Sequence, residues 1–124
     1  AEDNTINQLL IKTVLSQFNF TFTVCENGDE AVKTFKKETF DIVLMDLMMP
    51  KLDGYGASKA IREFESENNL KITPIMALSA DVTSNEIKKL KDYGINDYLH
   101  KPFDNSKLLE KVLFLTQNET NDTV

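Results

Sequence analysis

The sequence predicts an α/β fold in which helices cover both faces of a doubly wound parallel sheet. Short apolar segments rich in strand-forming residues alternate with segments of helical periodicity along the chain, which is the pattern of strands joined by helical crossovers. Polar side chains follow several of the apolar segments, most clearly Asp46 after residues 40–45. Functional groups in open α/β sheets lie at the carboxyl ends of the strands, so these polar positions are the first candidates for a site.

The first half of the chain is predicted to contain two helices and two strands. Apolar residues three or four positions apart indicate a helix over 5–18. Its apolar stripe consists of Ile6, Leu9, Leu10, Val14 and Phe18. Alternating β-formers over 21–25 indicate a strand, and a short helix follows at 31–37. The apolar run over 41–45 is predicted to be a buried strand that ends at Asp46.

The second half is predicted to contain three helices and two strands. The helices cover 57–64, 84–93 and 104–115, and the strands cover 75–78 and 97–100. Each helical segment carries an apolar stripe, the segment 75–78 is a short apolar run, and 97–100 is a short strand that ends before Lys101 and Pro102. The order of elements therefore continues the alternation that the first half begins.

Local signals indicate where helices and the domain end. Thr83 and Glu86 have the spacing of a capping box, and Gly94 is placed to end the same helix. The residues after 116 are polar and predict a frayed tail. We therefore expect one domain over 1–116 and a tail over 117–124.

Composition restricts the class of protein. The chain has 124 residues, 41% of them apolar, which suits one globular domain. Its net charge of −6 argues against nucleic-acid binding, which needs a positive surface. No apolar run approaches the roughly 20 residues that span a bilayer, so we expect no direct membrane contact. The single cysteine, Cys25, is expected to be buried, and its lack of a disulfide partner favours a reducing, cytoplasmic setting.

Five polar residues are expected to meet at the carboxyl edge of the sheet. They are Glu2, Asp3, Asp46, Ser79 and Lys101, each at or near the end of an expected strand. Crowded carboxylates repel one another, and oxygen ligands without His or Cys favour a hard cation, Mg²⁺ or Mn²⁺. A carboxylate can attack phosphorus to form an aspartyl phosphate, while a lysine and a hydroxyl hold the phosphoryl oxygens. Together the residues indicate phosphoryl transfer.

Each of these residues also has an ordinary structural explanation. An aspartate after a strand is usually a turn or cap residue. Glu2 and Asp3 alone would suit the dipole of the helix that follows them. A lone loop serine and a lone lysine are common at surfaces. The prediction of a site therefore depends on the co-occurrence of these residues, in order, at successive strand ends.

Motifs along most of the chain resemble the receiver domain of response regulators in two-component phosphorelays. They lie at residues 1–4, 6–8, 27–31, 44–50, 53–54, 74–80 and 94–103. Each motif alone is weak, but together and in this order they are specific. The opening motifs are most similar to receivers of hybrid histidine kinases.

The resemblance implies a flavodoxin-like fold and a role for each site residue. The fold is a five-stranded parallel sheet of order 2-1-3-4-5 with five helices. Asp46 would accept the phosphoryl group, and Lys101 and the switch hydroxyl of Ser79 would contact its oxygens. The implied Mg²⁺ ligands are Asp3, Glu2 through water, Asp46 and the carbonyl of Met48. Tyr98 would be the switch aromatic, and the bond from Lys101 to Pro102 would be cis.

Two features depart from the family's pattern. Ser79 stands where threonine is commoner, which is a mild change. The first strand is central in the implied sheet, yet only its last one or two residues, before Asn4, are in the sequence. We therefore expect most of that strand to lie upstream of Ala1.

The resemblance also implies a partner and a place in the cell. The domain would take a phosphoryl group from a histidine-containing phosphotransfer protein or a histidine kinase, and it would turn over no separate substrate. A helical partner is expected to dock on apolar residues beside the site, namely Ile6, Leu9, Met49, Pro102 and Phe103. The expected location is the cytoplasm, including the cytosolic part of a membrane-bound hybrid sensor kinase. No motif specifies the oligomeric state, the signal or the identity of the partner.

Two other functions remain open on the sequence alone. A degenerate receiver would act only as a protein-binding module, although the intact set of polar residues counts against this. A hydrolase of the haloacid-dehalogenase kind needs a second aspartate two residues after its nucleophile, where this chain has Met48. It also needs a cap domain, for which the chain shows no segment.

Overall fold

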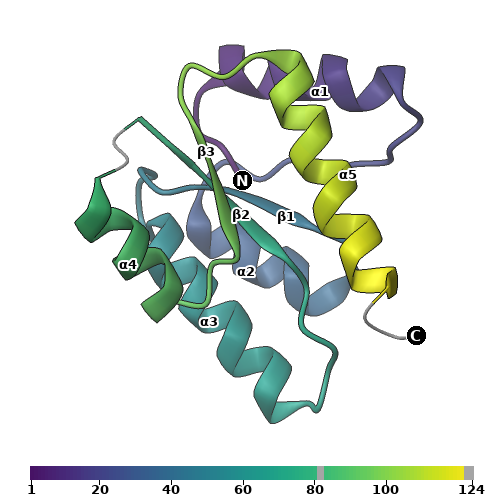
Figure 1. The fold of residues 1–124 in the computed structure, drawn as a ribbon. Helices are drawn as coiled ribbons and strands as arrows, with labels where there is room; N and C mark the ends of the chain where they lie inside the picture. Colours follow the sequence, from purple (N-terminus) through teal and green to yellow (C-terminus); the bar gives the residue numbers. More distant parts are fainter. Residues whose placement is uncertain (81–82, 122–124) are drawn as a thin grey trace.

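The computed structural model describes residues 1–80 and 83–121 and shows alternating helices and strands (Figure 1). The elements are α1 (Thr5–Gln17), α2 (Gly28–Lys37), β1 (Val43–Asp46), α3 (Gly54–Glu67), β2 (Ile75–Ser79), α4 (Ser84–Asp92), β3 (Asp97–His100) and α5 (Asn105–Asn121). The α/β class predicted from the sequence is confirmed. None of the helices in the described residues is both long and apolar enough to cross a membrane.

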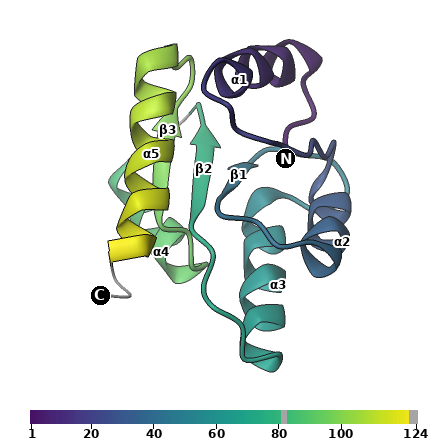
Figure 2. The same cartoon turned by 90° about the vertical axis from the view of Figure 1, so that its right-hand side faces the viewer.

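The three strands form one parallel sheet in the order β1-β2-β3. Met45 pairs with Ala77 in the first ladder, and Leu78 pairs with Leu99 in the second. Helices cover both faces, with α5 on one side and α2 and α3 on the other (Figure 2). All three strands run in the same direction, so their carboxyl ends meet at one edge of the sheet.

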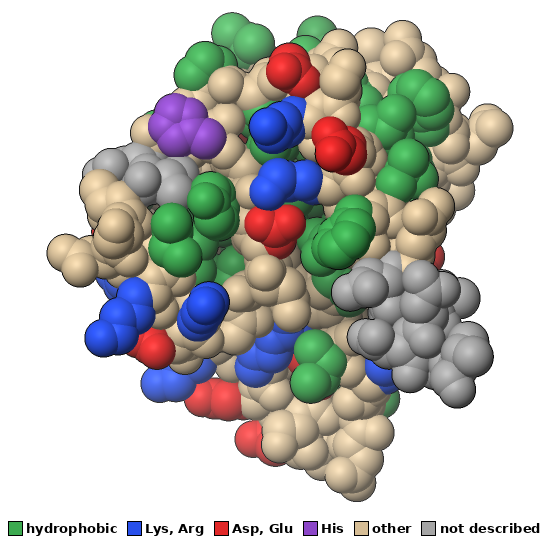
Figure 3. Space-filling model, viewed as in Figure 1, with side chains coloured by type: hydrophobic (Ala, Val, Ile, Leu, Met, Phe, Trp, Pro, Cys, Tyr) green, Lys and Arg blue, Asp and Glu red, His purple; other side chains and the backbone are tan. Residues whose placement is uncertain are grey.

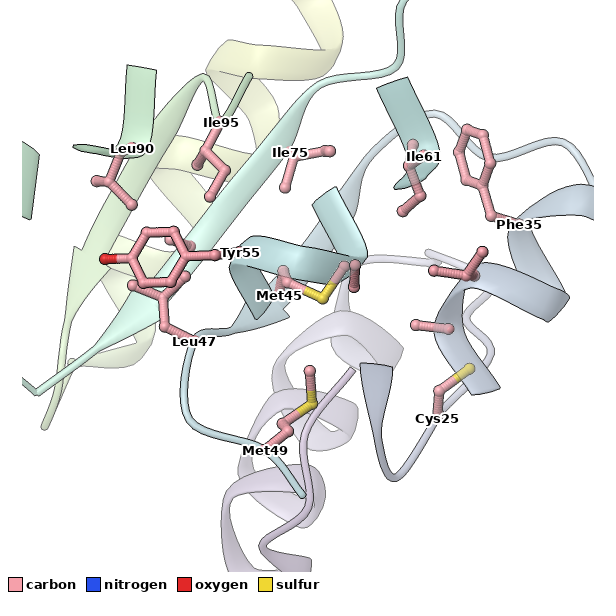
Figure 4. Packing of buried hydrophobic residues seen from close by; sticks show 14 residues of the cluster. Cys25, Phe35, Met45, Leu47, Met49, Tyr55, Ile61, Ile75, Leu90 and Ile95 are labelled. Carbon is pink, nitrogen blue, oxygen red and sulfur yellow. The ribbon is translucent and has the colours of Figure 1, made fainter. Parts of the chain in front are cut away.

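Each face of the sheet has its own hydrophobic cluster. The cluster under α2, α3 and α4 includes Met45, Ile75 and Ala77 from the strands, and Figure 4 shows most of its side chains. The cluster under α1 and α5 includes Met76 and Leu78, which are the alternate residues of β2. Successive strand residues point to opposite faces, so a strand buried on both sides reads as a continuous apolar run.

The described residues form three of the five strands of the implied sheet, most of whose first strand was expected to lie upstream of Ala1. The order of these three strands matches the last three of the predicted order 2-1-3-4-5, but residues 21–25 do not form a strand in the described structure. The amide of Glu2 donates to the Cys25 carbonyl (2.9 Å), and the Asp46 amide donates to the Ala1 carbonyl (3.0 Å). Ala1 and Glu2 thus lie between Cys25 and Asp46, in the position that the predicted order gives to the end of the first strand. Residues 21–24 form no ladder, because a strand needs a partner along its length and no strand lies beside them in the described structure.

Helix boundaries follow local signals closely at most ends. The Thr83 hydroxyl accepts from the Glu86 amide (3.2 Å), as the predicted capping box requires. Gly94 follows the end of α4 with φ of 78°, a conformation that suits glycine. Helix α3 begins at Gly54, earlier than predicted, because the Asp53 carboxylate accepts from the Gly56 amide (2.8 Å).

Two predictions about the helices were wrong. Helix α5 continues to Asn121, beyond the predicted end of the last helix at residue 115, and residues 122–124 of the expected tail lie outside the described residues. Adding residues to an existing helix avoids the cost of forming a new helical nucleus. On α1, Val14 and Leu15 are the buried positions, whereas Phe18 from the predicted stripe is half exposed.

Candidate functional site

Asp46 lies at the carboxyl end of β1, in the middle of the described site. Asp46 is 4% exposed, and its Oδ1 atom accepts a hydrogen bond from the backbone amide of Met48 (3.1 Å). The chain turns away directly after the strand, and the Gly54 amide donates to the Leu47 carbonyl (3.2 Å). A Cβ atom at Gly54 would lie 2.4 Å from the Asp46 carbonyl oxygen. The close approach of α3 to the Asp46 loop therefore requires glycine at this position.

Lys101 reaches the same place from the end of β3. Its Nζ lies 3.0 Å from Glu2 Oε1 and 3.1 Å from Asp46 Oδ2. The backbone amide of Lys101 donates to the Ser79 carbonyl (2.7 Å), which fixes the strand end next to β2. The bond from Lys101 to Pro102 is cis, as predicted.

Three carboxylates form an acidic cluster, defined here as Glu2, Asp3 and Asp46. One oxygen from each lies within 4.8 Å of the others, a spacing at which they could hold one metal ion. Asp3 is exposed, while Glu2 is 3% exposed. The Oε2 atom of Glu2 is buried and has no hydrogen-bond partner among the described residues. An orphaned buried carboxylate oxygen beside two more carboxylates fits a hard divalent cation.

The electrostatics of the site match this arrangement. Burial, and then the neighbouring Asp46 carboxylate, raise the pKa of Glu2 to about 7. Burial lowers the pKa of Lys101, but its hydrogen bonds to Glu2 and Asp46 outweigh that effect and raise it overall. The lysine therefore stays charged, yet one ammonium cannot neutralise three carboxylates. A divalent cation or a proton on Glu2 supplies the missing positive charge.

The two predicted switch residues lie on β2 and β3. Ser79 is half-buried at the carboxyl end of β2, where it pairs with His100, and its neighbour Leu78 pairs with Asp46. Tyr98 is half-buried in β3, and the Lys111 ammonium lies 5.2 Å from the centre of its ring. Both residues are thus near the carboxyl edge, and their roles stay predictions.

The predicted docking residues divide into exposed and buried ones. Ile6 and Leu9 are 76% and 65% exposed, Pro102 is exposed and Phe103 is half-buried. Met49 is only 9% exposed, so the prediction that it lies on the docking surface is wrong. The turn after β1 directs Met49 into the core under α2 and α3 (Figure 4).

The same turn exposes the neighbouring Met48, whose side chain is 81% exposed. Figure 3 shows further exposed hydrophobic side chains along the upper rim, the region that α1 occupies in Figure 1. The apolar surface beside the site is therefore formed by α1 and the loops after β1 and β3.

One supporting residue was missed by the sequence reasoning. The side-chain Nε2 of Gln8 donates to the Glu2 carbonyl (2.6 Å) and so holds the backbone next to the acidic cluster. The spacing of six residues between Glu2 and Gln8 matches no motif that would predict this hydrogen bond. The motif at 6–8 marked the position but not what the side chain contacts.

Comparison with known proteins gives a consistent result. A family model for the response regulator receiver domain matches residues 1–113. The sensor protein GacS of Pseudomonas syringae pv. syringae is 41% identical over 112 residues, covering 90% of this chain and 12% of that protein. Hybrid signal transduction histidine kinases of Dictyostelium discoideum are also among the relatives. The chain thus spans about an eighth or less of these relatives.

Two solved structures are similar over most of the chain. One is the receiver domain of the sensor histidine kinase PA1611 from Pseudomonas aeruginosa PAO1, with a magnesium ion in its active-site cleft. It is 32% identical with a TM-score of 0.83, covering 94% of this chain and 93% of that chain. The other is the receiver domain of Ssk1 from Saccharomyces cerevisiae, in a complex with the phosphotransfer protein Ypd1. It is 34% identical with a TM-score of 0.85, covering 89% of this chain and 81% of that chain.

Proposed function

Because the chain belongs to the response regulator receiver domain family, we propose that Asp46 is the residue that accepts the phosphoryl group. The observation that carries this proposal is the contact of Lys101 Nζ with both Glu2 and Asp46, at 3.0 and 3.1 Å. It brings residues from both ends of the chain to one strand edge. Asp46 is the member of the acidic cluster that the sheet holds most rigidly, since β1 ends at it.

The transfer moves a phosphoryl group from a histidine nitrogen to a carboxylate oxygen of Asp46. The phosphorus–nitrogen bond breaks, the phosphorus–oxygen bond forms, and the histidine nitrogen takes a proton from water. Lys101 leaves its ion pair with Asp46 to contact a phosphoryl oxygen, while its second partner, Glu2, keeps it near the site. Positioning and charge neutralisation are the main requirements of such a transfer.

A divalent cation, Mg²⁺ or in its place Mn²⁺, completes the charge balance of the site. When bound, it neutralises the phosphoryl oxygens and the carboxylates together. The ligands we propose are Asp3, Glu2 through water, Asp46 and the carbonyl of Met48. The unpartnered Oε2 of Glu2 supports this assignment, as does the magnesium ion in the cleft of the PA1611 receiver domain.

The switch would follow from a phosphoryl group on Asp46. The Ser79 hydroxyl would move toward a phosphoryl oxygen, and the space it leaves would admit the ring of Tyr98. Contacts that exist only in the phosphorylated state would shift the population of conformations. The half-buried positions of both side chains support this, because neither is locked in a fully packed core.

The partner we propose is a helical bundle that carries the phosphohistidine. The candidate surface consists of Ile6, Leu9, Pro102 and Phe103, with the exposed Met48 beside them. An apolar centre with a polar rim suits a specific and transient interface. The Ssk1 receiver in its complex with Ypd1 supports this kind of partner. We place the domain in the cytoplasm, as part of a larger sensor kinase like its relatives.

The direct test is phosphorylation with a small-molecule donor. Acetyl phosphate and Mg²⁺ should label the wild-type chain, and Asp46→Asn should abolish the label while keeping the fold. Asp41→Asn is the matched control, because Asp41 is exposed and precedes the other end of β1. Labelling of the Asp46 variant at the wild-type level would overturn the assignment. Absence of label in the wild type would favour the degenerate binding module.

A further inference from the structure

Helix α4 is the helix most weakly anchored in the core. Of its nine residues, all described, only Leu90 is buried. By contrast, α3 buries six residues. Helix α4 is also the next element along the chain after Ser79, the last residue of β2. With one buried side chain, α4 depends on its polar and aromatic contacts with α3 to stay in place.

The carboxyl end of α4 is held by Arg62 of α3. The Nε atom of Arg62 donates to the Gly94 carbonyl (2.9 Å), and its Nη2 donates to Asn96 Oδ1 (2.8 Å). Another Arg62 nitrogen, Nη1, is paired with Glu65 at 2.7 Å. Because this guanidinium is tied at several points, the carboxyl end of α4 is a fixed point.

Tyr55, in the first turn of α3, contacts α4 along its length and reaches the amino-terminal half of the helix at Glu86. The Tyr55 hydroxyl donates to the Glu86 carboxylate. The Lys89 ammonium lies 4.2 Å from the centre of the Tyr55 ring, and the Tyr93 ring lies 5.2 Å away. Figure 4 shows the Tyr55 ring in the cluster near Leu90, with its hydroxyl turned away from the centre.

Tyr55 is also tied closely to the Asp46 loop. Its neighbour Gly54 donates to the Leu47 carbonyl (3.2 Å) and lies against the Asp46 backbone. Tyr55 itself is 9% exposed, so its ring cannot follow α4 outward without leaving the core. Burial, and then the hydrogen bond to Glu86, raise the pKa of Tyr55, so the hydroxyl remains a donor at neutral pH.

We propose that Tyr55 is a positioning residue that latches the amino-terminal half of α4 to α3 and so opposes the change that phosphorylation of Asp46 brings about. This inference rests on the proposed function, since it needs a phosphoryl group on Asp46. When Ser79 moves toward that group, α4 pivots about the end that Arg62 holds, and the Tyr55–Glu86 hydrogen bond breaks. The strength of this bond therefore sets the balance between the two states.

The test compares Tyr55→Phe with Tyr93→Phe in the full chain. The first variant removes the hydroxyl that Glu86 binds and keeps the ring. The second removes a hydroxyl of the neighbouring ring, for which the described structure shows no hydrogen bond. The probe is beryllofluoride, a mimic of the phosphoryl group, titrated at saturating Mg²⁺. Amide hydrogen exchange of α4 is measured in parallel without beryllofluoride.

If Tyr55 is a latch, Tyr55→Phe should change both measurements and Tyr93→Phe should change neither. Tyr55→Phe should tighten the apparent beryllofluoride affinity by about fivefold, the effect of losing one such hydrogen bond in the unphosphorylated state. It should also speed exchange in residues 84–88 more than in 89–92. Tyr93→Phe should change neither. Glu86→Gln, which keeps an acceptor, should lie between Tyr55→Phe and the wild type.

Three results would count against the inference in different ways. Faster exchange in Tyr55→Phe with unchanged or weaker beryllofluoride affinity would mean that the bond is only structural, which overturns the latch. Equal behaviour of Tyr55→Phe and Tyr93→Phe would overturn it as well. No beryllofluoride response in the wild-type chain would overturn the proposed function itself, and with it this inference.

Discussion

The sheet region, residues 43–115, is packed far more tightly than the amino-terminal region, residues 1–25. Side chains with no exposure occur throughout the sheet region: Met45, Ile75, Met76, Ala77, Leu78 and Leu108. The much shorter amino-terminal region has as many exposed large apolar side chains as the described part of the sheet region: Ile6, Leu9, Leu10, Phe18 and Phe22. The two regions differ little in apolar content, so composition does not explain the contrast.

The contrast comes from pairing. Each strand of the sheet region has a continuous ladder, whereas residues 21–24 face a cavity of about 150 Å³ that separates them from β1. Val24, Ile42 and Leu44 are among its mainly apolar lining residues. At one end, the Ala1 ammonium donates to the Leu44 carbonyl (2.7 Å), and burial lowers its pKa. The cavity therefore has the place of a strand between residues 21–24 and β1, and Ala1 and Glu2 fill only the end of that place.

The largest change in the free energy of unfolding should come from filling the cavity beside β1 with a strand. Joining five alternating Val and Thr residues to the amino end of Ala1 should supply the central strand. Buried apolar side chains and new ladder bonds, less the cost of ordering five residues, should raise the free energy of unfolding by about 3–5 kcal/mol. Urea unfolding followed by circular dichroism measures this.

A control separates strand pairing from mere extension. The same extension with proline at its second and fourth positions cannot donate ladder bonds and should leave stability near the starting value. Equal stabilisation by both extensions would show that the cavity is not a strand position. It would also remove the explanation given above for the exposed side chains of the amino-terminal region.

The next effect compares two isoleucines, one from each region. Ile75→Ala removes a side chain that is fully buried in β2 and should cost about 2–5 kcal/mol, because it leaves a cavity. Ile6→Ala removes a side chain from the exposed face of α1 and should change stability by about 0.5 kcal/mol or less. Chemical denaturation of both variants tests the contrast, and similar losses would contradict it.

The sequence predicted the sheet region well because its signals are local. The strand that ends at Asp46 is buried on both faces, so it is apolar throughout and easily recognised. The caps of α3 and α4 come from residues within three positions of the helix start. The convergence of Asp46, Ser79 and Lys101 then follows from topology alone, because parallel strands end at one edge.

The amino-terminal region was predicted less well because its structure depends on distant partners. Residues 21–25 have a strand pattern, but a strand exists only when another chain segment pairs with it. The burial of Met49 depends on the shape of the turn after β1, which no spacing rule specifies. The link from Tyr55 to Glu86 joins residues 31 positions apart, and the capping-box spacing that marks Glu86 gives no sign of a contact with Tyr55.

A smaller effect concerns Glu2, which links the two regions through Lys101 (3.0 Å). Its folded pKa of about 7 lies above the ordinary 4.5. The protonated folded state therefore gives stability that is complete below pH 4.5 and is lost as pH rises to about 7. Without metal, the free energy of unfolding should fall over this window by on the order of 1 kcal/mol. Denaturation curves at pH 5 and 8 measure it.

Magnesium should reverse this trend, because a metal ion binds the deprotonated carboxylate. Mg²⁺ affinity, measured by titration, should rise between pH 6 and 8 in the wild type. In Glu2→Gln both the stability and the affinity should be nearly independent of pH in this range. A variant that keeps the full pH dependence would assign it to a group other than Glu2.

The smallest effect on stability is expected for Ile6→Asp, and it should be visible only in phosphoryl transfer. Ile6 is 76% exposed on α1, so a charge there meets water rather than the core and should leave the unfolding midpoint unchanged. At the centre of a docking surface, however, the same charge would be desolvated by the partner. Truncation of a central interface residue typically costs more than about 1 kcal/mol, so transfer from a phosphotransfer protein should slow about tenfold at subsaturating concentration. Acetyl phosphate, which needs no docking, should label the variant at the wild-type rate.

Phe18→Asp is the matched control, since Phe18 is also exposed but lies just beyond the other end of α1. Equal slowing by both variants would place the docking surface elsewhere, and loss of labelling by acetyl phosphate would mean that Ile6 supports the site itself.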